Sequence, residues 1–170
     1  MIKAKIKNKN IFIIIIIFVT ILFLGLVFKT SFNNSYVNTP NQSVREYSSK
    51  FLKFKIFVPS DYKIEDKEIS VTLIREKKEI NIVRNGTNFS NLEDYLVNFD
   101  SKRNINISDE NQLEIDGYSS VSRTVSVQDE NIIQKSYYIF VGKAVYIIST
   151  SSPELYEDLD QIARSFKYTP

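Results

Sequence analysis

The chain has 170 residues, with 22 basic and 20 acidic side chains, and it contains no cysteine and no histidine. It therefore forms no disulfide, and it lacks the commonest general base and the commonest nitrogen ligand of metals. Five lysines lie within residues 1–29, so the rest of the chain has 17 basic and 20 acidic side chains and a net charge of −3. This mildly acidic balance argues against nucleic-acid binding, which needs a clustered basic surface.

The first predicted element is a membrane-spanning helix at Ile11–Phe28. These eighteen residues carry no formal charge, and as a helix they would span about 27 Å, close to the thickness of a bilayer's hydrocarbon core. Four lysines precede the segment within residues 1–10, whereas only Lys29 follows it closely. Because basic flanks favour the cytoplasmic side, we predict a single-pass protein with a cytoplasmic stub at 1–10 and an extracytoplasmic C-terminal part.

A cleaved signal peptide is the alternative interpretation of the same segment. Its apolar region would span about 7–15 residues and end at a small-x-small site. The observed run is longer, and Phe28–Phe32 offers no Ala-x-Ala sequence. Both interpretations place the rest of the chain outside the cytoplasm.

Residues 29–50 are polar, aperiodic and rich in Asn, Ser and Thr. They predict a flexible linker, and the folded domain is expected at 51–170. Its first half predicts three strands: Phe51–Val58, which ends at Pro59, Ile69–Arg75 and Ile80–Arg84. A turn at Ser60–Lys63 and a charged loop at Glu76–Glu79 separate them, and a turn at Asn85–Gly86 follows the third.

A helix is predicted from Asn91 to about Lys102. Ser90 and Glu93 have the spacing of a capping box, in which each side chain bonds the other residue's backbone N–H. The apolar residues that follow recur at helical spacing: Leu92, Tyr95, Leu96 and Phe99.

The second half predicts antiparallel strands and a final helix. The strands are expected at Gln112–Ile115, Tyr118–Val127, Ile132–Val141 and Ala144–Ser151, with a type I′ turn at Asp116–Gly117, a turn at Asp129–Asn131 and a II′ turn at Gly142–Lys143. The last two strands are apolar on both faces, which indicates a sheet covered on two sides. Ser152 as cap and Pro153 at the first position predict a closing helix. The expected fold is α+β, an α/β/α sandwich with a central antiparallel sheet of six to seven strands after one transmembrane helix.

The domain resembles the PsbP-like family, which includes PsbP of photosystem II and bacterial envelope proteins of the DcrB type. Three motifs carry this resemblance over about Phe51–Tyr168: Phe54–Tyr62 ("F-x-I-x-x-P-x-D-aromatic"), Ile115–Tyr118, and Pro153–Leu155 with Ile162–Phe166. The resemblance implies an α/β/α sandwich and a non-enzymatic accessory or binding role. It carries over no site, because metal binding through histidine is ruled out here.

Two patterns of reactive side chains are candidates for catalysis or metal binding. Ser60 and Lys63 match Ser-x-x-Lys, but the Ser-Asp-Asn and Lys-Thr-Gly partners of that chemistry do not occur. Acidic pairs could bind calcium or serve as a glycosidase couple, but they lack EF-hand spacing and two of them fall at predicted turns: Asp109–Glu110, Asp129–Glu130 and Glu157–Asp158. We therefore expect no catalysis, no cofactor and no metal.

The remaining candidate surface is aromatic, since tyrosine offers apolar area with a polar tip. Its residues are Tyr118, Tyr137, Tyr138, Tyr146 and Tyr156, with Phe140 beside them. The leading hypothesis is a membrane-anchored extracytoplasmic protein that binds protein partners or supports an envelope assembly, with no nucleic acid involved. The alternatives are an envelope protein that binds a small ligand or lipid and, more remotely, an atypical hydrolase.

Overall fold

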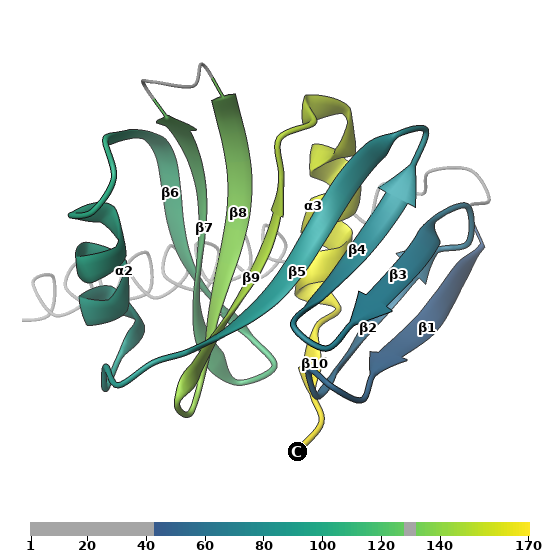
Figure 1. The fold of residues 1–170 in the computed structure, drawn as a ribbon, viewed down its shortest axis with the longest axis horizontal. Helices are drawn as coiled ribbons and strands as arrows, with labels where there is room; N and C mark the ends of the chain where they lie inside the picture. The colour runs from purple at the N-terminus through teal and green to yellow at the C-terminus, as the bar shows by residue number, and fades with distance from the viewer. Residues whose placement is uncertain (1–42, 128–131) are drawn as a thin grey trace, which may run out of the picture. The chain divides into compact units, whose positions relative to one another are not determined.

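The computed structural model describes residues 43–127 and 132–170 (Figure 1). The predicted anchor at 11–28 and the predicted turn at Asp129–Asn131 lie outside this part of the chain. Within it, no helix has the length and apolar character needed to cross a membrane.

Ten strands and two α-helices make up the described domain. The strands are β1 (Val44–Ser49), β2 (Phe54–Pro59), β3 (Lys63–Lys67), β4 (Ser70–Arg75), β5 (Lys78–Gly86), β6 (Ile105–Ile115), β7 (Tyr118–Val127), β8 (Ile132–Val141), β9 (Ala144–Thr150) and β10 (Lys167–Tyr168). The helices are α2 (Leu92–Asp100) and α3 (Tyr156–Arg164), the latter preceded by the 3₁₀ turn η1 (Pro153–Leu155).

The strands form two antiparallel sheets. The larger has seven strands in the order β3-β4-β5-β9-β8-β7-β6, and the smaller has three in the order β1-β2-β10. Sequential hairpins build most of the larger sheet, while β5 pairs with β9 across an insertion that contains α2 and three strands. The mixed α+β class and the seven antiparallel strands agree with the prediction; the small second sheet was not predicted.

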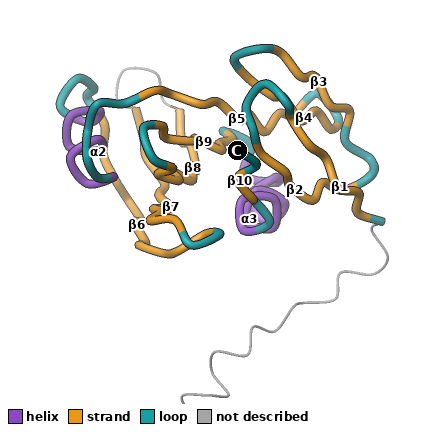
Figure 2. Tube along the Cα trace, turned by 90° about the horizontal axis from the view of Figure 1, so that it is seen from below, coloured by secondary structure: helices purple, strands orange, loops and turns teal. Residues whose placement is uncertain are grey.

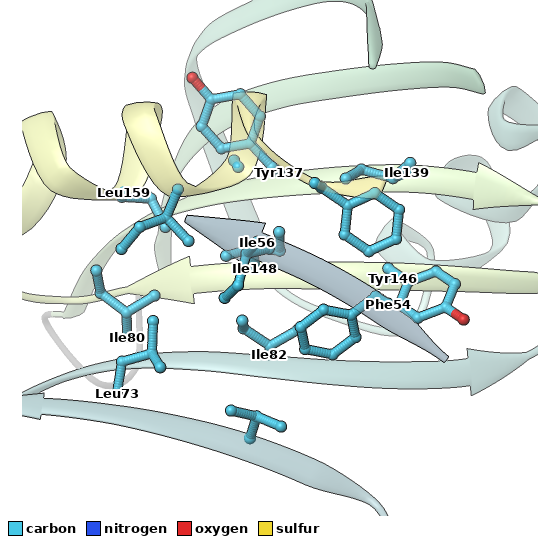
Figure 3. Close-up of a cluster of buried hydrophobic side chains, with 14 of the residues drawn as sticks. Phe54, Ile56, Leu73, Ile80, Ile82, Tyr137, Ile139, Tyr146, Ile148 and Leu159 are labelled. Atoms are coloured by element: carbon cyan, nitrogen blue, oxygen red, sulfur yellow. The ribbon is translucent and has the colours of Figure 1, made fainter. Parts of the chain in front are cut away.

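The two faces of the larger sheet are covered by different elements (Figure 2). Alternate residues of β8 and β9 belong to separate apolar clusters, as strand geometry requires. Tyr137 and Ile148 lie in the cluster formed with α3 and β2, and Figure 3 shows its side chains interdigitating. Tyr138 and Ile147 lie in the cluster formed with α2. All seven residues of β9 are buried, so the prediction of a strand covered on both faces is confirmed.

Several predicted boundaries are wrong. Val44–Ser49 form β1 inside the predicted linker, and β3 was not predicted. β1 is mostly exposed and lacks a clear apolar alternation, so only its pairing with β2 identifies it as a strand. Asn85 and Gly86 are not a turn but the end of β5, because Gly86 lies opposite Ala144 in β9. This long-range pairing overrides the local turn preference.

The predicted cap of α2 is wrong by one residue. Asn91 rather than Ser90 caps the helix, and its side chain accepts a hydrogen bond from the Asp94 backbone N–H at 2.8 Å. The Asp94 carboxylate accepts from the Asn91 side-chain amide rather than from the Asn91 backbone N–H, so only half of the capping-box pattern forms. At the last helix Ser152 is the cap residue and Pro153 the first residue of η1, as predicted, but Ser152 makes no side-chain cap bond. Its backbone N–H donates to Thr150 Oγ1 at 3.1 Å.

The predicted two-residue turns are confirmed by their backbone angles. Asp116 and Gly117 have φ of +53° and +78°, as a type I′ turn requires. Gly142 has φ of +59° and Lys143 does not have a positive φ, which fits type II′. The β4–β5 turn at Glu76 and Lys77 also has positive φ at both positions, +50° and +66°, although neither residue is glycine.

Replacing the β4–β5 turn residues should stabilise the domain. A left-handed conformation costs a residue with a Cβ about 1–2 kcal/mol, and Asn-Gly suits a type I′ turn. We expect Glu76→Asn with Lys77→Gly to raise the free energy of unfolding in urea by about 1 kcal/mol. The matched change Lys143→Gly, at a position without positive φ, should instead lower it by about 0.5–1 kcal/mol. Equal effects of the two changes would contradict this explanation.

Candidate functional site

The predicted tyrosine surface does not form. Tyr137, Tyr138 and Tyr146 are only 2%, 3% and 0% exposed, so they cannot meet a partner at the surface. They also face opposite sides of the sheet, because Tyr138 packs with α2 while the other two pack with α3 and β2. Tyr118 and Tyr156 are partly exposed. The hypothesis of one shared tyrosine surface is therefore wrong for Tyr137, Tyr138 and Tyr146.

The hydroxyl groups of the buried tyrosines explain how these residues are accommodated in the core. Tyr146 donates to the Leu52 carbonyl at 2.6 Å, and Tyr137 donates to Asp160 of α3 at 2.8 Å. Burial and the neighbouring Asp160 carboxylate raise the pKa of Tyr137 to about 12. Tyr137 and Tyr146 thus contribute apolar area to the core while their hydroxyl groups are hydrogen-bonded inside the domain.

Part of the Phe54–Tyr62 motif also serves the fold. Tyr62 donates to Asp158 of α3 at 2.8 Å, and Arg75 of β4 pairs with both Asp158 and Asp61. Burial and the bond to Asp158 raise the pKa of the Tyr62 hydroxyl well above its ordinary value. The Asp61-Tyr62 part of the motif therefore ties the β2–β3 connection to α3 and β4.

Within the described residues, the predicted reactive side chains are exposed or bonded to other groups, and Asp129–Glu130 lies outside this part of the chain. Ser60 and Lys63 are both exposed, and the Lys63 ammonium bonds Glu65 at 2.8 Å instead of Ser60. Asp158 is occupied by Tyr62 and Arg75, while Asp109 and Glu110 lie exposed on β6. Across residues 43–127 and 132–170, no cluster of three or more acidic side chains could hold a metal ion.

A cleft of about 480 Å³ lies between the end of β5 and α2. Three segments line it: Arg84, Asn85 and Gly86 from β5; Tyr95, Asn98 and Phe99 from α2; and Lys102 and Arg103 from the turn after α2. Asn98 and Phe99 lie three and four residues after Tyr95, so the three side chains share one side of α2, and Lys102 follows in the turn after the helix. The side of α2 next to β5 is thus the wall of the cleft.

The lining of the cleft is positively charged. Arg84, Lys102 and Arg103 are exposed, and no carboxylate lines the cleft. Arg84 lies opposite Tyr146 in the β5–β9 pairing, and its guanidinium is 6.0 Å from the Tyr146 ring centroid, on the face of the sheet away from α2. The charges that belong to the cleft are therefore those of Lys102 and Arg103. Asp100, the acid closest to them in the chain, bonds Arg123, and none of the described ion pairs involves Lys102 or Arg103. The site is suited to an anion.

Aromatic side chains form the apolar part of the cleft. Phe99 stacks on Tyr95 with ring centroids 5.9 Å apart, and the Arg103 guanidinium lies 4.1 Å from the Phe99 ring centroid. The two side chains thus make a cation–π contact at an exposed site. The Asn85 amide donates to the Tyr95 hydroxyl at 3.3 Å and so joins the end of β5 to the helix.

Arg123 of β7 binds the last residue of α2. Its side chain is 1% exposed, and its two terminal nitrogens donate to the Asp100 carboxylate at 2.8 and 2.7 Å. The guanidinium also lies 4.7 Å from the Tyr138 ring centroid. This bidentate pair joins the last residue of α2 to the sheet and removes the Asp100 charge from the cleft.

Sequence reasoning missed both the cleft and Arg123. The cleft is lined by the end of β5 and by α2 with the turn after it, two segments that come together only on folding. The adjacent pair Lys102-Arg103, directly after an amphipathic helix, was the available signal. Arg123 stood between Val121 and Val125 on the inward face of β7, a position that alternation marks as buried.

The fold has known counterparts. The chain is similar to the cyanobacterial PsbP (CyanoP) from Synechocystis sp. PCC 6803, with 14% sequence identity, coverage of 80% of this chain and 98% of that one, and a TM-score of 0.51. The described domain has the PsbP-like fold.

Two further solved structures are similar to this PsbP-like domain. A protein from Bacteroides thetaiotaomicron shares 13% identity over 76% of this chain and 50% of its own, with a TM-score of 0.51. The Pseudomonas aeruginosa protein PA94, of unknown function, shares 14% over 75% and 98%, with a TM-score of 0.48. No protein-family model matches the chain, and no curated protein matches it significantly in sequence. At these identities the likeness concerns the fold alone.

Removing the Asp100 carboxylate should destabilise the domain. In Asp100→Ala the buried Arg123 loses its bidentate partner but keeps Glu110, whose carboxylate oxygen lies 3.5 Å from Nη1. Breaking a buried ion pair costs about 3–5 kcal/mol when the remaining charge is left unpaired. Because Glu110 remains and the Asp100 side chain is 25% exposed, we expect a smaller loss of about 2 kcal/mol in urea unfolding. Glu93→Ala removes an exposed acid from the same helix and should change stability by about 0.5 kcal/mol or less. A similar small effect for Asp100→Ala would show that the pair does not hold α2.

Proposed function

We propose that the chain is a membrane-anchored accessory protein whose extracytoplasmic PsbP-like domain holds an anionic group of a partner in the β5–α2 cleft. The observation that carries the proposal is a pair of exposed cations, Lys102 and Arg103, that line one cleft with no carboxylate in its lining. Arg75, Arg123 and Lys135 form internal ion pairs that join helices to the sheet, in contrast to the cleft cations.

Binding rather than catalysis is favoured by the chemistry of the cleft. Its side chains are arginine, lysine, asparagine, tyrosine and phenylalanine, and none is a carboxylate or thiol that could act as a base or nucleophile near neutral pH. The sheet–α3 interface is filled with apolar side chains (Figure 3), which speaks against a lipid held inside the domain. An open, charged cleft at the surface suits the recognition of a partner's exposed group.

The membrane anchor is part of the proposal and has its own test. Two arginines in the middle of the segment, Ile17→Arg with Ile21→Arg, should each cost about 2.5–3.5 kcal/mol of insertion free energy. We expect the full-length variant to leave the membrane fraction on alkaline extraction, whereas Ile17→Leu with Ile21→Leu should remain. An N-terminal tag retained on the membrane-bound chain would distinguish an anchor from a cleaved signal. Membrane retention of the double-arginine chain would contradict the anchor.

The binding role can be tested in intact cells by photo-crosslinking. A photoreactive amino acid at Asn98, inside the cleft, should give a discrete crosslinked product. The same residue at Lys167, on β10 of the small sheet, should not. The Asn98 product should be lost when Lys102 and Arg103 are both changed to Gln, because the anion is held by charge. A product that persists in this double variant, or forms equally at Lys167, would contradict the proposal.

A further inference from the structure

We infer that one end of the domain makes contact with the surface of a membrane that contains anionic lipids. This surface of the domain, which we call the basic tip, consists of Lys50, Phe51, Lys53, Arg84 and Lys167. The inference rests on the membrane anchor of the proposed function and is independent of the β5–α2 cleft. Three features support it: a group of cations without acidic partners, an exposed aromatic ring among them and the length of the predicted linker.

The turn between β1 and β2 lies next to the last strand. Lys50, Phe51 and Lys53 belong to this turn, and the Lys53 carbonyl accepts a hydrogen bond from the Thr169 backbone N–H at 3.0 Å. Lys167 begins β10, which pairs with β2. Figure 1 shows β10 and the last residues of β1 at the same end of the domain. Three lysines from two distant segments are therefore brought together.

Arg84 joins these lysines from the larger sheet. Its guanidinium lies 6.0 Å from the ring centroid of Tyr146. The Tyr146 hydroxyl donates to the carbonyl of Leu52, in the turn between Lys50 and Lys53, at 2.6 Å. The Arg84 side chain therefore lies on the face of the sheet that carries the β1–β2 turn, opposite to the face that carries α2.

The charges of the basic tip are available to a partner. Its four basic residues are exposed, and the ion pairs of the described residues all involve other cations. Asp116, the acid of the neighbouring β6–β7 turn, accepts a hydrogen bond from the Tyr168 backbone N–H at 3.0 Å. Basic residues close to a membrane are attracted by the negative potential of anionic lipids. Four cations beside one such acid therefore favour contact with an anionic lipid surface.

Phe51 favours a lipid surface over other anionic partners. Its side chain is 62% exposed, whereas the next residue, Leu52, is buried in the core. Segments that lie at a membrane interface combine lysines with apolar side chains, which enter the boundary between headgroups and acyl chains. Burial there removes the apolar surface of the ring from water. A nucleic acid backbone would use the cations alone, and an acidic protein would need an apolar pocket for the ring in addition.

The predicted linker is long enough for the basic tip to reach the membrane. The described chain starts at Ser43, directly before β1. As the flexible coil predicted from the sequence, residues 29–42 would span about 21 Å on average. The six residues of β1 cover about 20 Å between this start and the tip. Because a tether keeps the domain close to the lipid, a contact that is weak by itself can be well populated.

The test measures whether the tip meets lipid in the full-length chain. The chain contains no cysteine, so Phe51→Cys gives a single site for an environment-sensitive fluorophore, whose apolar rings replace the phenyl ring. The labelled chain is reconstituted into vesicles of phosphatidylcholine with an equal amount of phosphatidylglycerol, and nitroxide groups on the lipid headgroups act as quenchers. We expect strong quenching and a blue shift of the emission, and clearly less of both in vesicles of phosphatidylcholine alone.

A second label position serves as the control. Glu76→Cys lies in the turn before β5, at the opposite end of this strand from Arg84. The same fluorophore at this position should show little quenching in either kind of vesicle.

Two matched variants of the Phe51-labelled chain test the charges. K50Q with K53Q should lower the ratio of contacting to free domains about 25-fold, or about fivefold for each lysine. The control, K63Q with K77Q, removes the same charge from exposed lysines of β3 and of the β4–β5 turn and should leave the quenching unchanged. Lys53 and Lys77 both have positive φ, +59° and +66°, so the two variants place glutamine in comparable backbone conformations.

The outcomes separate the lipid contact from the anchor. If the vesicles retain the full-length chain but the label at position 51 is quenched no more than the label at position 76, the lipid contact is overturned while the anchor stands. The same conclusion holds if K50Q with K53Q leaves the quenching unchanged. If the vesicles do not retain the full-length chain, the anchor and the lipid contact both fail.

Discussion

The domain is organised around a strand that cannot be exposed on either face. All seven residues of β9 are buried, with Tyr146 and Ile148 directed to one side of the sheet and Val145 and Ile147 to the other. Burying a large apolar side chain stabilises the folded state by about 1.5–3 kcal/mol relative to its exposure. Both faces therefore need a cover, and the chain supplies α3 with the small sheet on one side and α2 on the other.

The two covers are held by different means. The α3 side has a large apolar cluster of twenty-one buried residues, whereas the α2 side has seven. The smaller interface is supplemented by the Arg123–Asp100 pair, which joins the end of α2 to β7. A buried ion pair is expensive to desolvate and adds little net stability, but it fixes the position of the helix. It also occupies the acidic group nearest to Lys102 and Arg103, so the charge of the cleft follows from the way in which α2 is attached.

Apolar alternation and turn residues predicted those elements whose conformation is set by residues close to them in the chain. The bounds of β8, the two glycine-containing turns and the doubly buried β9 follow from alternation and from residues that tolerate positive φ. β1 and the end of β5 could not be found in this way, because their strand conformation depends on partners far along the chain. The predicted tyrosine surface is wrong for a related reason. Tyr137 and Tyr138 are consecutive residues of a strand, and consecutive side chains of a strand point to opposite faces of the sheet. The cleft needed β5 and α2 to be placed together first.

The net charge of the domain does not decide what a local site can bind. The chain beyond Lys29 has a net charge of −3, yet Lys102 and Arg103 line a cleft whose lining contains no carboxylate. At physiological salt the potential at a site is set mainly by charges within about 8 Å. Two adjacent cations can therefore attract an anion although the domain is acidic, provided that nearby carboxylates are paired with other cations. Because Arg123 binds Asp100, the contact that attaches α2 to the sheet also leaves the cleft positive.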